Sequence, residues 1–129
     1  MVEIDNEHFE KIISLTENYI LNSKYYKIEE IDKLVYSRQN GIVYFFYIKE
    51  NNNFILKYIG KSTGKGFKTR LRAHFFGIGK GTQSKFEKIN KEKEIVYKFI
   101  ETKPLALRNF IEEILIERYS MTNELWNYK

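Results

Sequence analysis

The chain has 129 residues, of which 43% are hydrophobic and 16% aromatic, and this composition predicts one folded domain with a hydrophobic core. It contains no cysteine and two histidines, which excludes disulfides, a cysteine nucleophile and a zinc site built from several histidines. No apolar run is long enough to span a bilayer, and the acidic N-terminus lacks the basic start of a signal peptide, so we expect a cytoplasmic protein with no membrane partner.

Residues 1–40 are predicted to form a helical addition ahead of the main motif. Apolar residues recur at near-helical spacing over 6–22, and Asp5 or Asn6 can serve as the N-cap. A second short helix is expected from Ile28 to Val35, with Val35 among its inward residues. Because this addition is acidic overall, we expect it to cover one face of a sheet rather than contact a polyanion.

A β-hairpin is predicted next. Residues 42–48 and 54–59 are mostly β-branched or aromatic, and the three asparagines at 51–53 are a turn signal between them. The second strand is expected to end at Gly60, where a glycine-rich stretch begins.

A basic helix is expected after this stretch, because Phe67, Leu71 and Phe75 are spaced four residues apart. On that helix Arg70 and His74 are also four apart and therefore share a face. Further along the chain, a short helix is predicted over 84–93, a third strand over 95–100, and a long helix from just after Pro104 to about Tyr119.

The positive charge is concentrated on residues 51–86, which hold eight basic residues and no acidic one, leaving 14 basic and 17 acidic residues elsewhere. A localised basic segment is typical of a surface that binds a polyphosphate, although a solvated lysine-rich surface would have the same composition. The basic residues are Lys57, Lys61, Lys65, Lys68, Arg70, Arg72, Lys80 and Lys85.

An ordered set of residues in this region resembles the GIY-YIG nuclease superfamily. Tyr44 lies on the first strand, Tyr58-Ile59-Gly60 ends the second, Lys61 follows at once, and Arg70 and His74 have the family's helical spacing. The resemblance covers roughly residues 41–128. It departs from the family at Gly41-Ile42-Val43-Tyr44, where either one residue is inserted or Ile42 stands at the usual glycine position.

The resemblance implies roles for individual residues in phosphodiester hydrolysis. Glu112 would be the sole protein ligand of one divalent cation, Mg²⁺ or Mn²⁺. Tyr44 would be the base or the relay that takes a proton from water, with His74 assisting the transfer. The remaining catalytic positions implied by the family are Tyr58, Lys61, Arg70 and Asn127, and the DNA contacts are assigned to Lys57, Lys65, Lys68, Arg72, Lys80 and Lys85.

Two of these assignments have rivals in the sequence. Helical periodicity does not separate Glu112 from Glu113 and Glu117, and Glu112 is preferred because the family's acid is followed, after two residues, by a bulky apolar pair. Asn123 is the alternative to Asn127 as the late asparagine of the family. The stretch Gly60–Thr63 imitates a nucleotide-binding P-loop, but the first glycine of that motif would fall on an isoleucine, so nucleotide hydrolysis is rejected.

The sequence therefore predicts a small α+β domain with a mainly antiparallel three-stranded sheet flanked by helices. Residues 41–129 would form the nuclease core of this single domain. The expected function is metal-dependent cleavage of DNA by a one-metal, tyrosine-assisted mechanism. The alternatives are a catalytically silent nucleic-acid binding module on the same fold and a structural or partner-binding protein. No separate DNA-reading motif is present, so a homodimer or a separate specificity partner is also considered.

Overall fold

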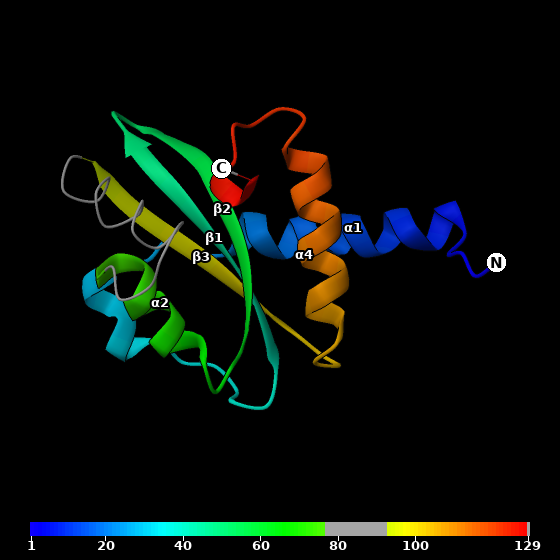
Figure 1. Cartoon of the computed structure of the whole chain (residues 1–129), viewed down its shortest axis with the longest axis horizontal. Coiled ribbons are helices and arrows are strands. Elements are labelled where there is room, and N and C mark those ends of the chain that lie inside the picture. The colour runs from blue at the N-terminus through cyan, green and yellow to red at the C-terminus, as the bar shows by residue number, and fades with distance from the viewer. Residues whose placement is uncertain (77–92, 129) are drawn as a thin grey trace.

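The structure, a computed structural model of the chain, describes residues 1–76 and 93–128 (Figure 1). The elements in chain order are α1 (Asn6–Asn22), the 3₁₀ helix η1 (Ile28–Lys33), β1 (Gly41–Glu50), β2 (Asn53–Thr63), α2 (Phe67–Phe76), β3 (Glu94–Thr102), α4 (Leu107–Tyr119) and the 3₁₀ helix η2 (Trp126–Tyr128). The predicted α+β fold with a three-stranded antiparallel sheet is confirmed. The helix predicted over 84–93 falls, apart from Lys93, outside the described residues, as do Lys80 and Lys85.

The sheet has the order β2-β1-β3, and both pairs of neighbours are antiparallel. Tyr58 pairs with Phe46 and Leu56 pairs with Tyr47, so Lys57 is the extra residue of a β-bulge. The prediction that β2 ends at Gly60 is wrong. The strand continues to Thr63, because its cross-strand hydrogen bonds to β1 extend to the first residue of that strand.

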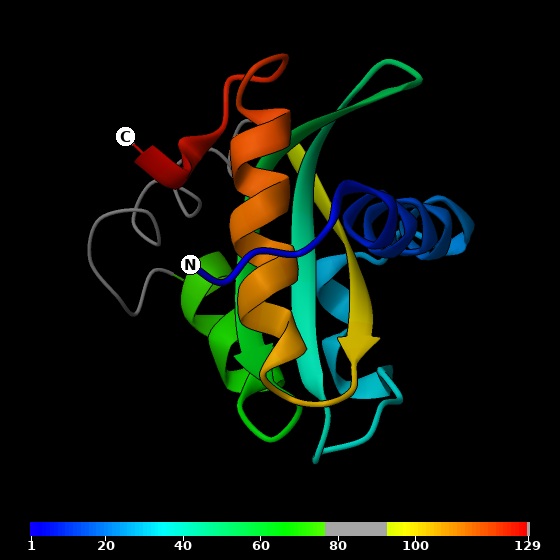
Figure 2. The same cartoon turned by 90° about the vertical axis from the view of Figure 1, so that its right-hand side faces the viewer.

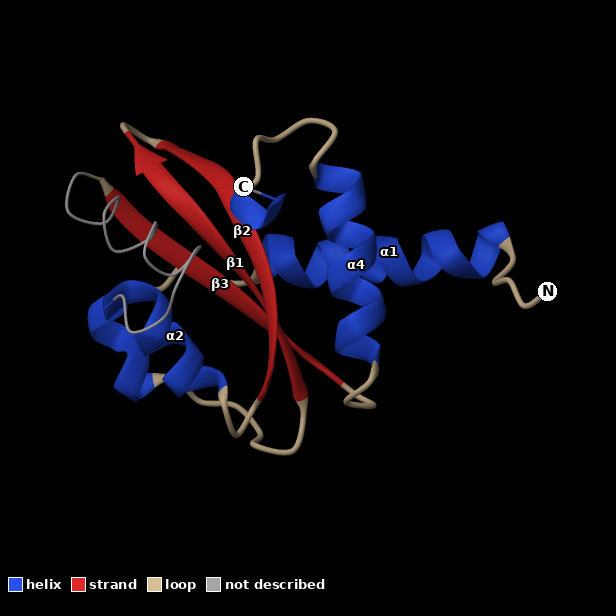
Figure 3. Ribbon diagram, viewed as in Figure 1, coloured by secondary structure: helices blue, strands red, loops and turns tan. Residues whose placement is uncertain are grey.

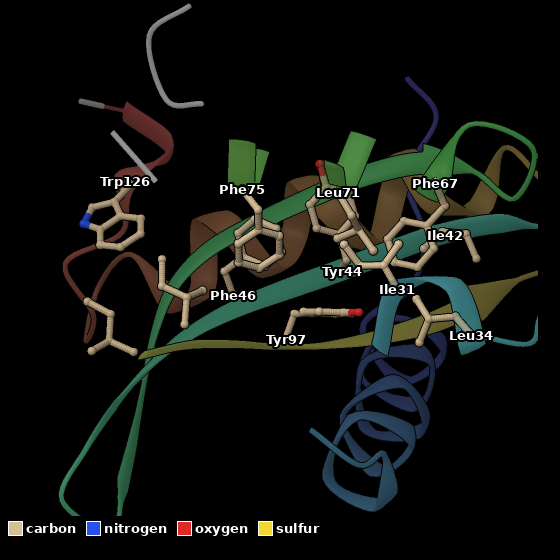
Figure 4. Close-up of a cluster of buried hydrophobic side chains, with 12 residues drawn as sticks. Ile31, Leu34, Ile42, Tyr44, Phe46, Phe67, Leu71, Phe75, Tyr97 and Trp126 are labelled. Carbon is tan, nitrogen blue, oxygen red and sulfur yellow. The ribbon is translucent and has the colours of Figure 1, made fainter. Parts of the chain in front are cut away.

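Helices cover both faces of the sheet, because successive residues of the central strand β1 point to opposite sides and residues 41–46 are all buried. On one side α2 and η1 pack over Tyr44, Phe46 and Tyr97. On the other side α4 packs over Val43 and Phe45. Figure 3 shows the strands lying between these two helical layers, and Figure 4 shows the aromatic cluster under α2.

The N-terminal addition contributes to both helical layers rather than to one. Ile20 of α1 belongs to the α4-side cluster, whereas Ile31 of η1 belongs to the α2-side cluster. Figure 2 shows α1, in dark blue, beside the yellow strand β3. Between them the chain passes the outer edge of β3, where Tyr26 exchanges two backbone hydrogen bonds with Tyr97. The predicted N-cap is confirmed at Asp5, whose side chain accepts a hydrogen bond from the His8 backbone.

The predicted inward orientation of Val35 is wrong, because its side chain is 89% exposed. The 3₁₀ helix ends at Lys33 and the chain becomes extended at Leu34, so the helical period no longer applies to the residue after it. Among the described residues, none of the helices combines the length and the apolar character needed to cross a membrane.

Candidate active site

The edge strand β2 carries functional side chains toward both faces of the sheet. Tyr58 points to the α2 side, where it packs against the aromatic cluster. Lys61, three residues later, points to the α4 side, where it pairs with Glu112. The predicted catalytic residues therefore come together around the end of β2 that lies between α2 and α4 (Figure 1).

Tyr44 and His74 form a buried polar pair on the α2 side. The Tyr44 hydroxyl oxygen lies 2.9 Å from Nε2 of His74. Burial raises the pKa of Tyr44 above its ordinary value, the neighbouring Tyr58 raises it further, and the positive charge of Arg70 opposes the rise. Burial, aided by Arg70, lowers the pKa of His74 to about 4. Both groups are therefore neutral at pH 7, and a neutral imidazole can accept the phenol's proton in a hydrogen bond.

Position 60, next to the Tyr44–His74 pair, requires glycine. It lies opposite Tyr44 on the neighbouring strand, and a Cβ atom at Gly60 would lie 2.3 Å from Cζ and 2.4 Å from the hydroxyl oxygen of Tyr44. No side chain larger than hydrogen fits at that distance without moving the phenol. The glycine of the Tyr-Ile-Gly motif is thus explained by packing against the tyrosine of the other strand.

Arg70 is the charge that links the members of the site. Arg70 lies on the exposed side of α2, next to the inward residues Phe67 and Leu71. Its positive charge lowers the pKa values of four site residues, namely Tyr44, Tyr58, His74 and Glu112. An arginine so placed can stabilise negative charge that develops near the tyrosines during a reaction.

Glu112 is the carboxylate that faces the site. Its side chain is 15% exposed, and Oε1 lies 3.6 Å from Nζ of Lys61. Burial raises the pKa of Glu112, and the charges of Lys61 and Arg70 oppose the rise. Glu113 and Glu117 are exposed. The geometry thus separates three glutamates that periodicity leaves equivalent.

Asn127 contacts the protein backbone rather than another site residue. Its Oδ1 accepts a hydrogen bond from the Ile59 N–H at 3.1 Å, and its Nδ2 donates to the Ile59 carbonyl at 2.6 Å. The amide thus pairs with both backbone groups of Ile59 on the open side of β2, next to Tyr58 and Gly60. Asn123 instead bonds to Tyr119 and Thr122, away from the sheet.

A groove beside these residues, called the first groove below, has a volume of about 660 Å³. Basic and small polar residues make up most of its lining: Lys61, Ser62, Thr63, Lys65, Gly66, Thr69, Arg70, Ala73 and Arg108. The sequence reasoning missed Arg108. The available signal was its position four residues before Glu112, which places both side chains on one face of α4.

Four of the residues predicted to bind DNA lie in the described part of the chain, and they do not all line the first groove. Lys65 lines the first groove. Lys68 and Arg72 lie on the other side of α2, where Lys68 donates to the Asp32 carbonyl and Arg72 pairs with the Asp32 carboxylate. Lys57 lies at the bulge of β2.

Comparison with known proteins decides the family. A family model described as the GIY-YIG catalytic domain matches residues 40–125. The chain belongs to the GIY-YIG family. The match spans the three strands, α2 and α4, so it covers every residue predicted to be catalytic except Asn127. Neither a curated protein nor a solved structure matches the chain.

The departure from the GIY-YIG motif lies within β1. The β1 register runs without interruption from Gly41 to Phe46, and Ile42 lies in this strand two residues before Tyr44. The Ile42 side chain is buried in the α2-side cluster.

The donor set of the site fits one hard divalent cation. Within residues 1–76 and 93–128, no cluster of three or more His, Asp or Glu side chains could hold a metal. Mg²⁺ needs no such cluster, because it retains waters and binds through one or two carboxylates together with substrate phosphate. Glu112, partly buried beside the first groove, is a carboxylate of that kind.

Proposed function

We propose that this GIY-YIG protein is a divalent-metal-dependent DNA endonuclease that hydrolyses phosphodiester bonds. The observation that carries the proposal is the meeting of two polar pairs at one end of β2, Tyr44 with His74 on one face and Lys61 with Glu112 on the other. Such hydrolysis needs a proton acceptor for the attacking water and positive charge near the phosphate. Both lie beside a groove lined by cations.

In the proposed reaction the attacking water gives its proton to the Tyr44 oxygen while the Tyr44 proton passes to Nε2 of His74. The water oxygen bonds to phosphorus, the bond from phosphorus to the leaving sugar oxygen breaks, and that oxygen takes a proton from solvent. The relay is supported by the 2.9 Å contact between the Tyr44 hydroxyl and Nε2 of His74. The lowered pKa of His74 keeps the imidazole neutral at pH 7, so that Nε2 can accept a hydrogen bond from the phenol.

Charge on the phosphate would be balanced by Arg70, with Tyr58 orienting the phosphate and Lys61 beside it. Glu112 would hold the cation, Mg²⁺ or Mn²⁺, which when bound supplies charge stabilisation to the phosphate and to the leaving oxygen. Asn127 would act as a positioning residue, because it fixes the backbone between Tyr58 and Gly60.

A catalytically silent nucleic-acid binding module is the second candidate. The observation that favours it is the complete burial of Tyr44, whose side chain is 0% exposed, because a proton acceptor has to meet the attacking water. In this case the first groove would hold a phosphate without cleaving it.

The deciding experiment incubates the purified chain with supercoiled plasmid, single-stranded DNA and branched DNA, in Mg²⁺, in Mn²⁺ and in chelator. Glu112→Gln is compared with Glu113→Gln, a matched control one residue away whose side chain is exposed. We expect metal-dependent cleavage that Glu112→Gln reduces by orders of magnitude and Glu113→Gln leaves unchanged, while both bind DNA in chelator. Binding without cleavage by the wild-type chain on every substrate would support the silent module instead.

A further inference from the structure

A second groove adjoins the first. It is lined by Leu34, Val35, Tyr36, Arg38, Gly64, Lys65 and Lys68. Lys65 belongs to both linings, so the two grooves meet at the loop between β2 and α2. Part of the second groove therefore comes from the N-terminal addition, outside the residues that match the GIY-YIG family.

The contributing segment is fixed to the core by its backbone. The Gly64 N–H donates to the Asn40 carbonyl at 2.8 Å, and the Lys65 N–H donates to the Arg38 carbonyl at 3.1 Å. A Cβ atom at Gly64 would lie 2.1 Å from the Ser37 carbonyl oxygen, so glycine permits this close approach. The position of Arg38 relative to Lys65 is thus set by hydrogen bonds rather than by a loose chain.

The charges of the second groove favour an anion. Arg38 and Lys65 are exposed, and Lys68 lies over the ring of Tyr36. Lys68 donates to the Asp32 backbone carbonyl, and the Asp32 carboxylate is paired with Arg72, which balances its charge. Arg108, which lines the first groove, adds a further positive charge on that side.

We propose that the second groove is a subsite for the nucleic-acid backbone that flanks the phosphate in the first groove. A strand that crosses both grooves passes Lys65 and reaches Arg38. This inference rests on the proposed function for its substrate. It also places part of residues 1–40 in the nucleic-acid interface, whereas the net negative charge of that segment had predicted that it would not contact a polyanion. Contacts of this kind are with phosphates, which position a duplex without reading its sequence.

The first test is a proximity measurement that needs no cleavage. The chain has no cysteine, so Val35→Cys provides a unique thiol for an environment-sensitive dye at a side chain that is 89% exposed. The matched control is Leu15→Cys on α1, which packs on the opposite side of the sheet. In chelator, adding a duplex of mixed sequence should change the emission at position 35 and leave it unchanged at position 15. No change at 35, or equal changes at both positions, would overturn the proposal.

The second test measures the salt dependence of binding. Arg38→Gln removes one phosphate contact and should lower the slope of log affinity against log salt by about one. Lys33→Gln, an exposed charge on η1 that lines neither groove, should match wild type. Thermal unfolding should be unaffected in both variants, because Arg38 is held through its carbonyl. A wild-type slope for Arg38→Gln would reject the subsite even if plasmid is cleaved, whereas failure of cleavage alone would leave this binding result standing.

Discussion

The Tyr44 hydroxyl and Nε2 of His74 are hydrogen-bonded at 2.9 Å, and neither side chain is more than 3% exposed. Burial moves their pKa values in opposite directions, upward for the phenol and downward to about 4 for the imidazole. The pair therefore stays neutral over a wider pH range than either group would in water. Neither Tyr44 nor His74 therefore has to carry a charge in the buried site before a proton passes between them.

The depressed pKa of His74 predicts a loss of stability in acid. The unfolded chain binds a proton at His74 below about pH 6.5, whereas the folded chain resists it until about pH 4. Stability should therefore fall between these two values, by roughly 3 kcal/mol in total from this group. Denaturant unfolding of wild type and His74→Gln from pH 4 to pH 8 measures the difference. Parallel pH profiles for the two proteins would show that His74 does not resist protonation in the fold.

Tyr44→Phe should abolish most activity while keeping the fold. The change removes the hydroxyl that bonds His74 and costs about 1 kcal/mol of stability. We expect cleavage to fall by about a hundredfold or more, with DNA affinity unchanged. Tyr97→Phe is the matched control, because the Tyr97 hydroxyl is buried on the same side of the sheet and has no hydrogen-bond partner in the described part of the chain. Equal activities of the two variants would argue against the relay.

Gly60→Ala should disturb the site through packing alone. The new methyl group would overlap the Tyr44 ring and force it away from His74, at a cost of about 1–3 kcal/mol. Gly66→Ala is the control, because its Cβ would meet, among the described residues, Thr63 and Ser62 at the looser distances of 3.3 and 3.5 Å. Thermal unfolding and cleavage should both be impaired far more by Gly60→Ala. A fully active Gly60→Ala protein would contradict the described Tyr44 position.

Asn127→Ala should loosen the edge of β2. Removing the amide leaves the Ile59 N–H and carbonyl without this partner, and amide hydrogen exchange at Ile59 should accelerate. We expect a stability loss of about 1–2 kcal/mol and a lower kcat with little change in DNA affinity. Asn123→Ala, which leaves these two bonds intact, should not change exchange at Ile59.

Two charge reversals on the basic segment should have different effects. Lys65→Glu places an acid where the two grooves meet and should weaken DNA binding most at low salt. Arg72→Glu places an acid against Asp32 and should instead lower stability. Binding titrations and thermal unfolding of both variants separate the effects. A larger binding defect for Arg72→Glu would move the interface to the η1 side of α2.

Helices and strands could be predicted from the sequence where a clear hydrophobic pattern extends over a long segment. The spacing of Phe67, Leu71 and Phe75 predicts α2, and the β-branched run after Gly41 predicts β1. The end of β2 was misplaced because glycine is a local breaking signal, whereas pairing with β1 is a tertiary effect that overrides it.

Parts of the site could not be read from one sequence. Arg38 reaches the second groove only because its carbonyl bonds the Lys65 amide, a contact between segments with no shared pattern. Lys65 and Lys68 are three residues apart in a segment that has no acidic residue. Lys68 nevertheless bonds to the carbonyl of Asp32, which is distant in the sequence. Charge counting locates such a run, but it does not say which side of a helix each cation occupies.

The hydrogen bonds of Asn127 to Ile59 and of Tyr26 to Tyr97 occupy one position on each outer strand of the sheet. An open strand edge is a template on which another chain can add a strand, and proteins commonly block it. A second copy of this protein could not extend the sheet past these positions without displacing native bonds. Self-association through the sheet, if two active sites are needed to cut both strands of a duplex, would therefore be restricted to short stretches of each outer strand on either side of these positions.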